Sequence, residues 1–98
     1  MPIIAVAELR AGFLHGQKVT KYGPILDDFL SDTRTTVLHI TDETAPIYAE
    51  LYAHTRKVGK QLSNNDLWIA ALCVQYGYPL FTLDKDFDAL PQVRRIRP

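Results

Sequence analysis

The sequence predicts an α/β fold in which helices flank a mainly parallel sheet. Short apolar runs rich in β-branched residues alternate along the chain with longer segments whose apolar residues recur at helical spacing. This alternation is typical of strand–helix–strand units, which build parallel sheets. With 98 residues, 47% of them hydrophobic and 22% charged, residues 1–98 have the size and composition of one small globular domain.

The first part of the chain is predicted to hold a strand, two helices and a second strand. Residues 2–6 (PIIAV) are a β-branched apolar run, which favours a buried strand. A helix follows from Ala7 and ends at Gly16, and another spans residues 22–31. Residues 35–40 (TTVLHI) favour the next strand. The apolar face of the second helix is predicted to consist of Tyr22, Ile25, Leu26, Phe29 and Leu30.

Two longer helices are predicted in the second part of the chain. Thr41 or Asp42 caps the first of them, which ends near Gly59. Ser63 begins the second, which is apolar on nearly all sides and is closed by Gly77. A helix of this kind must be buried against other elements.

The C-terminal segment is predicted to contain two short strands. Residues 80–83 form an apolar strand, residues 84–90 a turn or short helix, and residues 93–96 a last strand with alternating basic residues.

Composition argues against several classes of protein. Eleven basic residues balance eleven acidic ones, so only local patches could attract nucleic acid. Cys73 is the single cysteine, and no Cys/His cluster has the spacing of a zinc site. The longest apolar run, residues 67–74, is too short to span a membrane, and the N-terminus lacks the basic flank of a secretory signal. We therefore expect a cytoplasmic protein.

Three carboxylates are predicted to lie where a parallel sheet binds its ligands, at the carboxyl ends of the strands. Glu8 follows the predicted strand 2–6, Asp84 follows the predicted strand 80–83, and Asp66 lies in the first turn of the apolar helix. Carboxylates brought this close repel one another unless a cation lies between them. An all-oxygen site of this kind suits Mg²⁺ or Mn²⁺. The pattern predicts a metal site.

Each of these carboxylates also has an ordinary structural interpretation. Ser63-x-x-Asp66 has the spacing of a capping box, so Asp66 can serve the helix start. Asp84 is equally typical of a turn or an N-cap, and Glu8 is typical of a solvated helix residue. Basic residues that could hold an RNA backbone are also typical of a solvated face. They are Arg10, Lys18, Arg56, Lys57, Arg94 and Arg95.

A longer pattern resembles a known family. Residues 63–87, SNNDLWIAALCVQYGYPLFTLDKDF, resemble the C-terminal signature of PIN domains, in which an Asn-Asp-Leu-x-Ile-Ala-Ala helix precedes a strand and Thr-x-Asp-x-Asp-Phe. Residues 5–12 (AVAELRAG) resemble the second acidic motif of that family, in which a Glu opens the helix after a strand. Residues 38–51 resemble the connecting strand and helix of its toxin members, the VapC-type toxins of VapBC toxin–antitoxin systems.

The resemblance implies a metal-dependent ribonuclease. Its catalytic and metal-binding positions fall on Glu8, Asp66 and Asp84, with Asp86 as a further metal ligand, and the implied cofactor is Mg²⁺ or Mn²⁺. Thr82 matches the hydroxyl residue near that site, and Asn65 matches the residue that precedes Asp66 in many toxins and orients it.

PIN domains open with a strand that ends in Asp-x-Asn, and no segment here matches it, because Met1 falls within the expected second strand. On this interpretation, residues 1–98 are a partial PIN domain, truncated at the N-terminus. Two functions stay open: an endoribonuclease toxin, and a non-catalytic remnant that self-associates or binds an antitoxin. A different metal-dependent phosphoryl hydrolase would explain the acidic residues but not the PIN motifs.

The resemblance also implies partners, namely an RNA substrate and a VapB-like antitoxin. A missing central strand would leave backbone groups unpaired, which favours a homodimer with exchanged elements. Tyr48 and Tyr52 are predicted either to contact a protein partner or to pack in the core with only their hydroxyls exposed.

Overall fold

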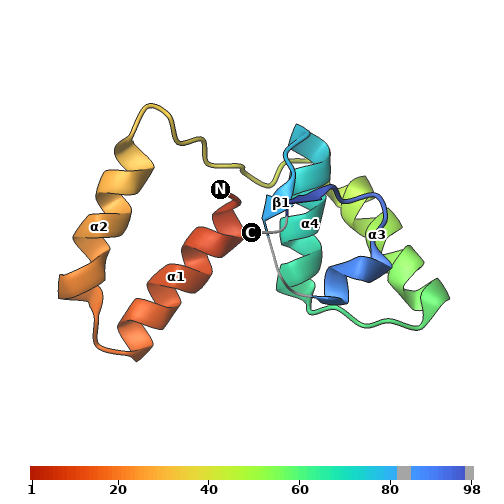
Figure 1. Cartoon of the computed structure of the whole chain (residues 1–98), viewed down its shortest axis with the longest axis horizontal. Helices are drawn as coiled ribbons and strands as arrows, with labels where there is room; N and C mark the ends of the chain where they lie inside the picture. Colours follow the sequence, from red (N-terminus) through yellow and green to blue (C-terminus); the bar gives the residue numbers. More distant parts are fainter. Residues whose placement is uncertain (82–84, 97–98) are drawn as a thin grey trace. The chain divides into compact units, whose positions relative to one another are not determined.

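The computed structural model describes residues 1–81 and 85–96, and the side chains of these except Phe81, Lys85, Asp86 and Ile96. Its elements are α1 (Ile3–His15), α2 (Val19–Ser31), α3 (Thr44–Val58), α4 (Asn64–Tyr76), β1 (Leu80–Phe81), the 3-10 helix η1 (Lys85–Ala89) and β2 (Arg95–Ile96) (Figure 1). They fall into an N-terminal unit, Met1–His39, and a C-terminal unit, Ile40–Pro98. No helix in the described ranges is long and apolar enough to cross a membrane.

The N-terminal unit is a helical hairpin in which α1 and α2 lie side by side (Figure 1). As predicted, α1 ends at Gly16. The rings of Phe13 and Tyr22 stack with their centroids 5.6 Å apart, and Arg10 Nη2 lies 2.8 Å from Asp27 Oδ1 across the hairpin. Burial of apolar side chains and an exposed ion pair therefore stabilise the packing of α1 against α2, and the burial contributes more free energy than the ion pair.

The strand predicted for residues 2–6 is wrong, because these residues begin α1. The Pro2 carbonyl accepts hydrogen bonds from the amides of Ala5 and Val6, at 3.0 and 3.3 Å, which starts the helix. The strand predicted for residues 35–40 reduces to one isolated parallel bridge between Pro2 and Leu38. A short apolar run is compatible with a strand or a buried helix, and periodicity alone does not separate the two.

The predicted helix over residues 22–31 is confirmed, although α2 begins three residues earlier, at Val19. Its predicted apolar face is only partly correct. Leu26 is buried, whereas Ile25 is 62% exposed and Phe29 is 51% exposed. Helical spacing places these side chains on one side of α2, but what packs against that side is decided elsewhere in the structure.

The C-terminal unit is built around the packing of α3 against α4 (Figure 1). Helix α4 is buried along most of its length, as its apolar sequence predicts, and Leu51 of α3 and Leu67 of α4 are each only 2% exposed. Burial also raises the pKa of the Cys73 thiol. The main core cluster consists of Leu51, Leu67, Ala70, Ala71, Phe87, Leu90 and Val93.

Helix α4 has the boundaries that the sequence predicts. The Ser63 hydroxyl accepts a hydrogen bond from the Asp66 amide at 3.1 Å, which satisfies one of the free donors of the first turn. Gly77 closes the helix with φ of 73°, a left-handed conformation that favours glycine. Helix α3 ends in the same way, at Gly59, also with φ of 73°.

The start of α3 differs from the prediction, since its N-cap is Glu43 and neither Thr41 nor Asp42. The Thr41 hydroxyl donates to Glu43 and holds the pKa of that carboxyl below its usual value. The Thr44 hydroxyl donates to Gln75 Oε1, and Gln75 Nε2 donates to Thr41 Oγ1 at 2.9 Å. The side chains that sequence spacing suggests as caps instead tie the start of α3 to the end of α4.

The described part of the sheet is a single pair of parallel strands. Leu80 of β1 pairs with Arg95 of β2, and Phe81 pairs with Ile96. The predicted strand 93–96 is thus shorter than expected, and positions 82 and 83 of the other predicted strand lie outside the described residues. The pairing of β1 with β2 confirms the predicted parallel direction. The predicted extent of the sheet is not confirmed, because the described ranges are mostly helical.

We expect Ser63→Ala to lower the free energy of unfolding by about 1 kcal/mol, because the Asp66 amide would lose its acceptor. Urea denaturation measures this. A suitable control is Ser31→Ala, since the Ser31 hydroxyl only donates to a carbonyl of its own helix, that of Asp28. If both variants lost the same free energy of unfolding, the Ser63 hydroxyl would not stabilise the start of α4 more than an ordinary helical serine stabilises its helix.

Candidate functional site

Asp66 is the predicted site residue that the structure describes best. It lies in the first turn of α4, and its side chain is half-buried. The capping interpretation is confirmed for its backbone, because the Asp66 amide donates to the Ser63 hydroxyl. That bond does not use the Asp66 carboxylate, so capping leaves the carboxylate available for chemistry.

Glu8 does not have the predicted position at the end of a strand. It lies within α1, and its side chain is exposed. This exposed position on a helix agrees with the alternative interpretation of Glu8 as a solvated helix residue. Because Glu8 belongs to the N-terminal unit and Asp66 to the C-terminal unit, the predicted convergence of their carboxylates stays a prediction.

The remaining predicted residues of the acidic site, Thr82, Asp84 and Asp86, follow β1 in the sequence. Thr82 and Asp84 lie outside the described residues, and for Asp86 only the backbone is described, within η1. In the described ranges, no three or more His, Cys, Asp or Glu side chains are grouped so as to hold a metal ion. The predicted metal centre therefore stays a prediction.

Tyr48 of α3 fixes the turn that carries Asp66. Its hydroxyl donates to Asn64 Oδ1 at 3.2 Å, and its ring stacks on Trp68 with the centroids 4.1 Å apart. The first turn of α4 is therefore held from two sides, by the Ser63 cap and by α3. The aromatic spacing of Tyr48 and Tyr52 indicated an interaction surface, but it gave no sign of this positioning role.

The stack continues from Tyr48 to the C-terminal end of α3. The rings of Tyr48 and Tyr52 lie 6.3 Å apart, and the Arg56 guanidinium lies 5.0 Å from the centre of the Tyr52 ring. Arg56 Nε and Nη2 also donate to the Tyr52 hydroxyl, at 3.0 and 2.6 Å. Trp68, Tyr48, Tyr52 and Arg56 together form what we term the aromatic–arginine stack.

The interpretation that Tyr48 and Tyr52 are both core residues is wrong for Tyr52. The Tyr52 side chain is exposed, with 38% of its surface accessible, while Tyr48 is half-buried. Contact of these tyrosines with a protein partner stays a prediction.

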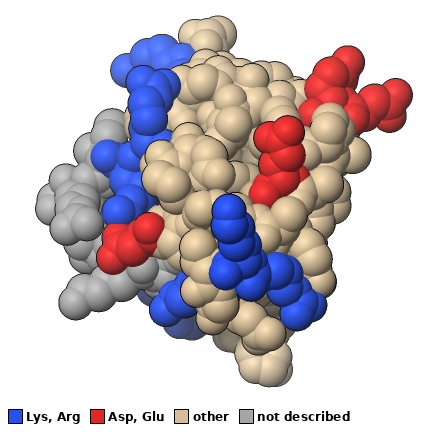
Figure 2. Space-filling model, turned by 90° about the vertical axis from the view of Figure 1, so that its right-hand side faces the viewer, with Lys and Arg blue, Asp and Glu red and all other residues tan. Residues whose placement is uncertain are grey.

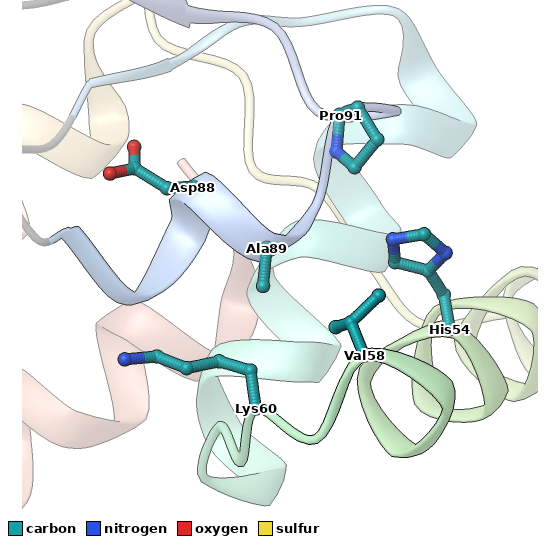
Figure 3. A pocket seen from close by; sticks show the side chains of 6 residues that line it. All are labelled: His54, Val58, Lys60, Asp88, Ala89 and Pro91. Carbon is teal, nitrogen blue, oxygen red and sulfur yellow. The ribbon is translucent and has the colours of Figure 1, made fainter.

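Two cavities of the C-terminal unit adjoin the end of α3. One, of about 350 Å³, lies beside the aromatic–arginine stack, where Arg56 and Asn64 form part of its wall. The other, of about 640 Å³, lies between α3 and η1 (Figure 3). In Figure 3, His54 and Val58 of α3 face Ala89 and Pro91 across this second cavity.

Comparison with known proteins places these elements in a family. The family model of the PIN domain matches residues 1–93. The chain belongs to the PIN domain family. The resemblance predicted from residues 63–87 is thereby confirmed.

Curated relatives of this PIN domain include two ribonucleases of Mycobacterium tuberculosis. The chain is 33% identical over 88 residues to Ribonuclease VapC5, an alignment that covers 90% of this chain and 65% of the relative. It is 29% identical over 94 residues to Ribonuclease VapC4, covering 96% of this chain and 72% of that protein. The chain thus spans slightly less than two thirds of the length of VapC5.

Solved structures with a similar fold include two VapBC structures and FitAcB. VapBC2 from Rickettsia felis, bound to a DNA fragment from their promoter, has a TM-score of 0.87 and 27% identity, over 98% of this chain and 71% of that one. VapBC-5 from Mycobacterium tuberculosis, a member of the VapBC family of toxin–antitoxin systems, has a TM-score of 0.76 and 29% identity, over 99% and 79%. FitAcB from Neisseria gonorrhoeae has a TM-score of 0.73 and 27% identity, over 97% and 72%. These similarities support the predicted PIN-like α/β fold.

Four of the six basic residues that the sequence suggests for RNA binding have ion-pair or hydrogen-bond partners among the described residues, Arg56 with the Tyr52 hydroxyl. Arg10 pairs with Asp27, Arg95 Nη2 lies 2.6 Å from Asp88 Oδ1, and Arg94 donates to the Gly77 carbonyl. On the face drawn in Figure 2, lysine and arginine side chains stand in small separate groups between acidic ones. On this face, positive charge is therefore local and is not gathered into one patch.

Proposed function

We propose that this PIN domain is a metal-dependent endoribonuclease toxin of a VapBC-type toxin–antitoxin module. The family match over residues 1–93 carries this proposal, and the ribonucleases VapC5 and VapC4 among its relatives support it. The Asn-Asp-Leu-Trp-Ile-Ala-Ala segment adds local support, because it puts Asp66 in the first turn of α4.

The proposed metal ligands are Glu8, Asp66, Asp84 and Asp86, and the proposed ion is Mg²⁺ or Mn²⁺. Such an ion, when bound, activates water and neutralises charge that develops on a phosphate. The protein's own contribution at Asp66 is positioning. The Ser63 cap and the Tyr48–Asn64 hydrogen bond hold the helical turn from which the carboxylate projects, so the backbone at Asp66 is fixed in place.

Cleavage of a labelled single-stranded RNA by the purified chain tests this function. We expect cleavage in the presence of Mg²⁺ or Mn²⁺ and none after the metal is chelated. RNA that is bound but never cut, with either metal, would contradict the enzymatic proposal and favour the non-catalytic alternative. A cytoplasmic location remains part of the proposal.

The proposed partners are a VapB-like antitoxin and a second copy of the chain. The complexes that share this fold support the antitoxin. Large apolar side chains on the helical hairpin support further contacts, since Leu14 is 70% exposed, Ile25 62% and Phe29 51%.

We expect the purified chain to be a homodimer at micromolar concentration, because burying these apolar side chains against a second copy removes them from water. Light scattering measures the mass in solution. A monomer that melts cooperatively would contradict this expectation.

A further inference from the structure

The polar cavity beside the aromatic–arginine stack has no role in the acidic site described above. Its volume is about 350 Å³, at the small end of the range of about 300–1,000 Å³ that is usual for ligand sites. Polar side chains predominate in its wall. The lining residues that matter here are Tyr52, Arg56, Gln61 and Asn64.

Arg56 is held in one orientation at the wall of this cavity. Its guanidinium lies over the Tyr52 ring and donates to the Tyr52 hydroxyl through Nε and Nη2. An arginine side chain carries five N–H donors, so this contact leaves three for a ligand. In the described ranges, the recorded ion pairs do not involve Arg56. The guanidinium is thus a preorganised cation without a carboxylate partner in this part of the chain.

We propose that this cavity is a subsite for a phosphate of single-stranded RNA, with Arg56 as the anion-binding group and Tyr52 as the residue that positions it. This inference rests on the proposed ribonuclease function, which supplies the RNA. Guanidinium groups bind phosphate oxygens in a bidentate manner, and the amides of Gln61 and Asn64 add hydrogen-bonding groups to the same wall.

The position of the cavity makes it a flanking subsite and not the place of cleavage. Asn64 lines it, whereas Asp66 follows two residues later on α4 and faces a different side of the helix, at about 100° per residue. The two sides of a helix lie about 10 Å apart. An RNA strand that passes the first turn of α4 would therefore need to span about this width to place another of its phosphates beside Arg56.

The chemistry of the cavity favours RNA over a protein partner. Single-stranded RNA is recognised by cations together with aromatic and guanidinium planes, and Arg56 on Tyr52 presents that combination. An apolar antitoxin segment would find few apolar side chains in this wall.

Fluorescence anisotropy with a fluorescein-labelled single-stranded RNA oligonucleotide tests the subsite. The full chain carries Asp66→Asn, so that the RNA is not cut, and Mg²⁺ is present throughout. We expect Arg56→Ala to raise the Kd about 10-fold and to reduce the slope of log Kd against log salt by about 0.7, the value for one single-strand phosphate contact.

Three further variants separate the subsite from general charge. Lys57→Ala removes an exposed cation next to Arg56 that does not line the cavity, and we expect less than about a 2-fold change. Arg56→Lys should keep the salt slope and weaken binding about 3-fold, because the planar fork is lost. Tyr52→Phe should weaken binding by a similar factor but have no effect when Arg56 is already alanine, since the tyrosine acts through the guanidinium.

Circular dichroism melts show whether each variant is folded. Unchanged RNA affinity of Arg56→Ala, or an equal loss in Lys57→Ala, would overturn the subsite and return this face to the role of a protein contact. Absence of cleavage of the same RNA by the chain with Asp66 intact would overturn the proposed function, whereas cleavage together with unchanged affinity of Arg56→Ala would overturn the subsite alone.

Discussion

Replacing Asp66 with asparagine is expected to lower the rate of metal-dependent RNA cleavage by at least about 100-fold. Loss of a residue that only orients a metal ligand already costs about 10- to 100-fold in affinity or activity, so loss of a ligand itself should cost at least the upper value. The amide that replaces the carboxylate keeps its size but loses the charge that holds a divalent cation.

The fold should not account for this loss. The Ser63 cap uses the backbone amide of Asp66, which the substitution leaves in place, so we expect the free energy of unfolding to change by less than about 1 kcal/mol. A matched control is Glu50→Gln, which makes the same carboxylate-to-amide change at an exposed position of α3. It should leave the cleavage rate unchanged.

Binding of Mn²⁺, followed by electron paramagnetic resonance, provides a second measurement that does not depend on turnover. We expect Asp66→Asn to weaken Mn²⁺ binding and Glu50→Gln to leave it unchanged. If both variants bind Mn²⁺ as the parent chain does, Asp66 is a helix-start residue and not a metal ligand.

Leu51→Ala is expected to destabilise the C-terminal unit by about 2–5 kcal/mol, the largest effect on stability that we predict. Leu51 is 2% exposed and belongs to the core cluster in which α3, α4 and the η1 segment meet. Truncation would remove contacts of the side chain and leave a cavity between packed elements. A small domain has a total stability of only about 5–15 kcal/mol, so much of the population could unfold.

Chemical denaturation of Leu51→Ala and Leu14→Ala gives a matched comparison. Leu14 is 70% exposed, so the same chemical change there should alter the free energy of unfolding by no more than about 0.5 kcal/mol. If the two variants lost equal stability, the core would not lie where the structure has it.

Three of the four boundaries of α3 and α4, all except the start of α3, could be predicted from the sequence because they depend on local chemistry. Ser63 caps α4 through a bond to the amide three residues on, and Gly59 and Gly77 take positive φ values that other residues reach only with strain. None of these features needs a distant partner. The apolar length of α4 likewise predicts its burial, because a helix without a polar face has no side to turn to water.

The N-terminal unit was predicted less well, because its conformation depends on non-local partners. Residues 2–6 have the β-branched composition of a strand, yet they form the start of α1, and Leu38 meets Pro2 at a single bridge. Whether a short apolar run becomes a strand depends on the neighbours that can accept its backbone hydrogen bonds. Its own residues do not contain that information.

By itself, the sequence determined the family of this protein, the C-terminal end of α3, both limits of α4, and the placement of Asp66 in a capped first turn. These follow from motifs and from hydrogen bonds that span a few residues. Only the tertiary structure decided that Tyr48 holds that turn and that Arg56 borders a polar cavity. The reason is physical: Tyr48 meets Asn64 only because α3 packs against α4, and the cavity is shaped by residues from both helices and the loop between them.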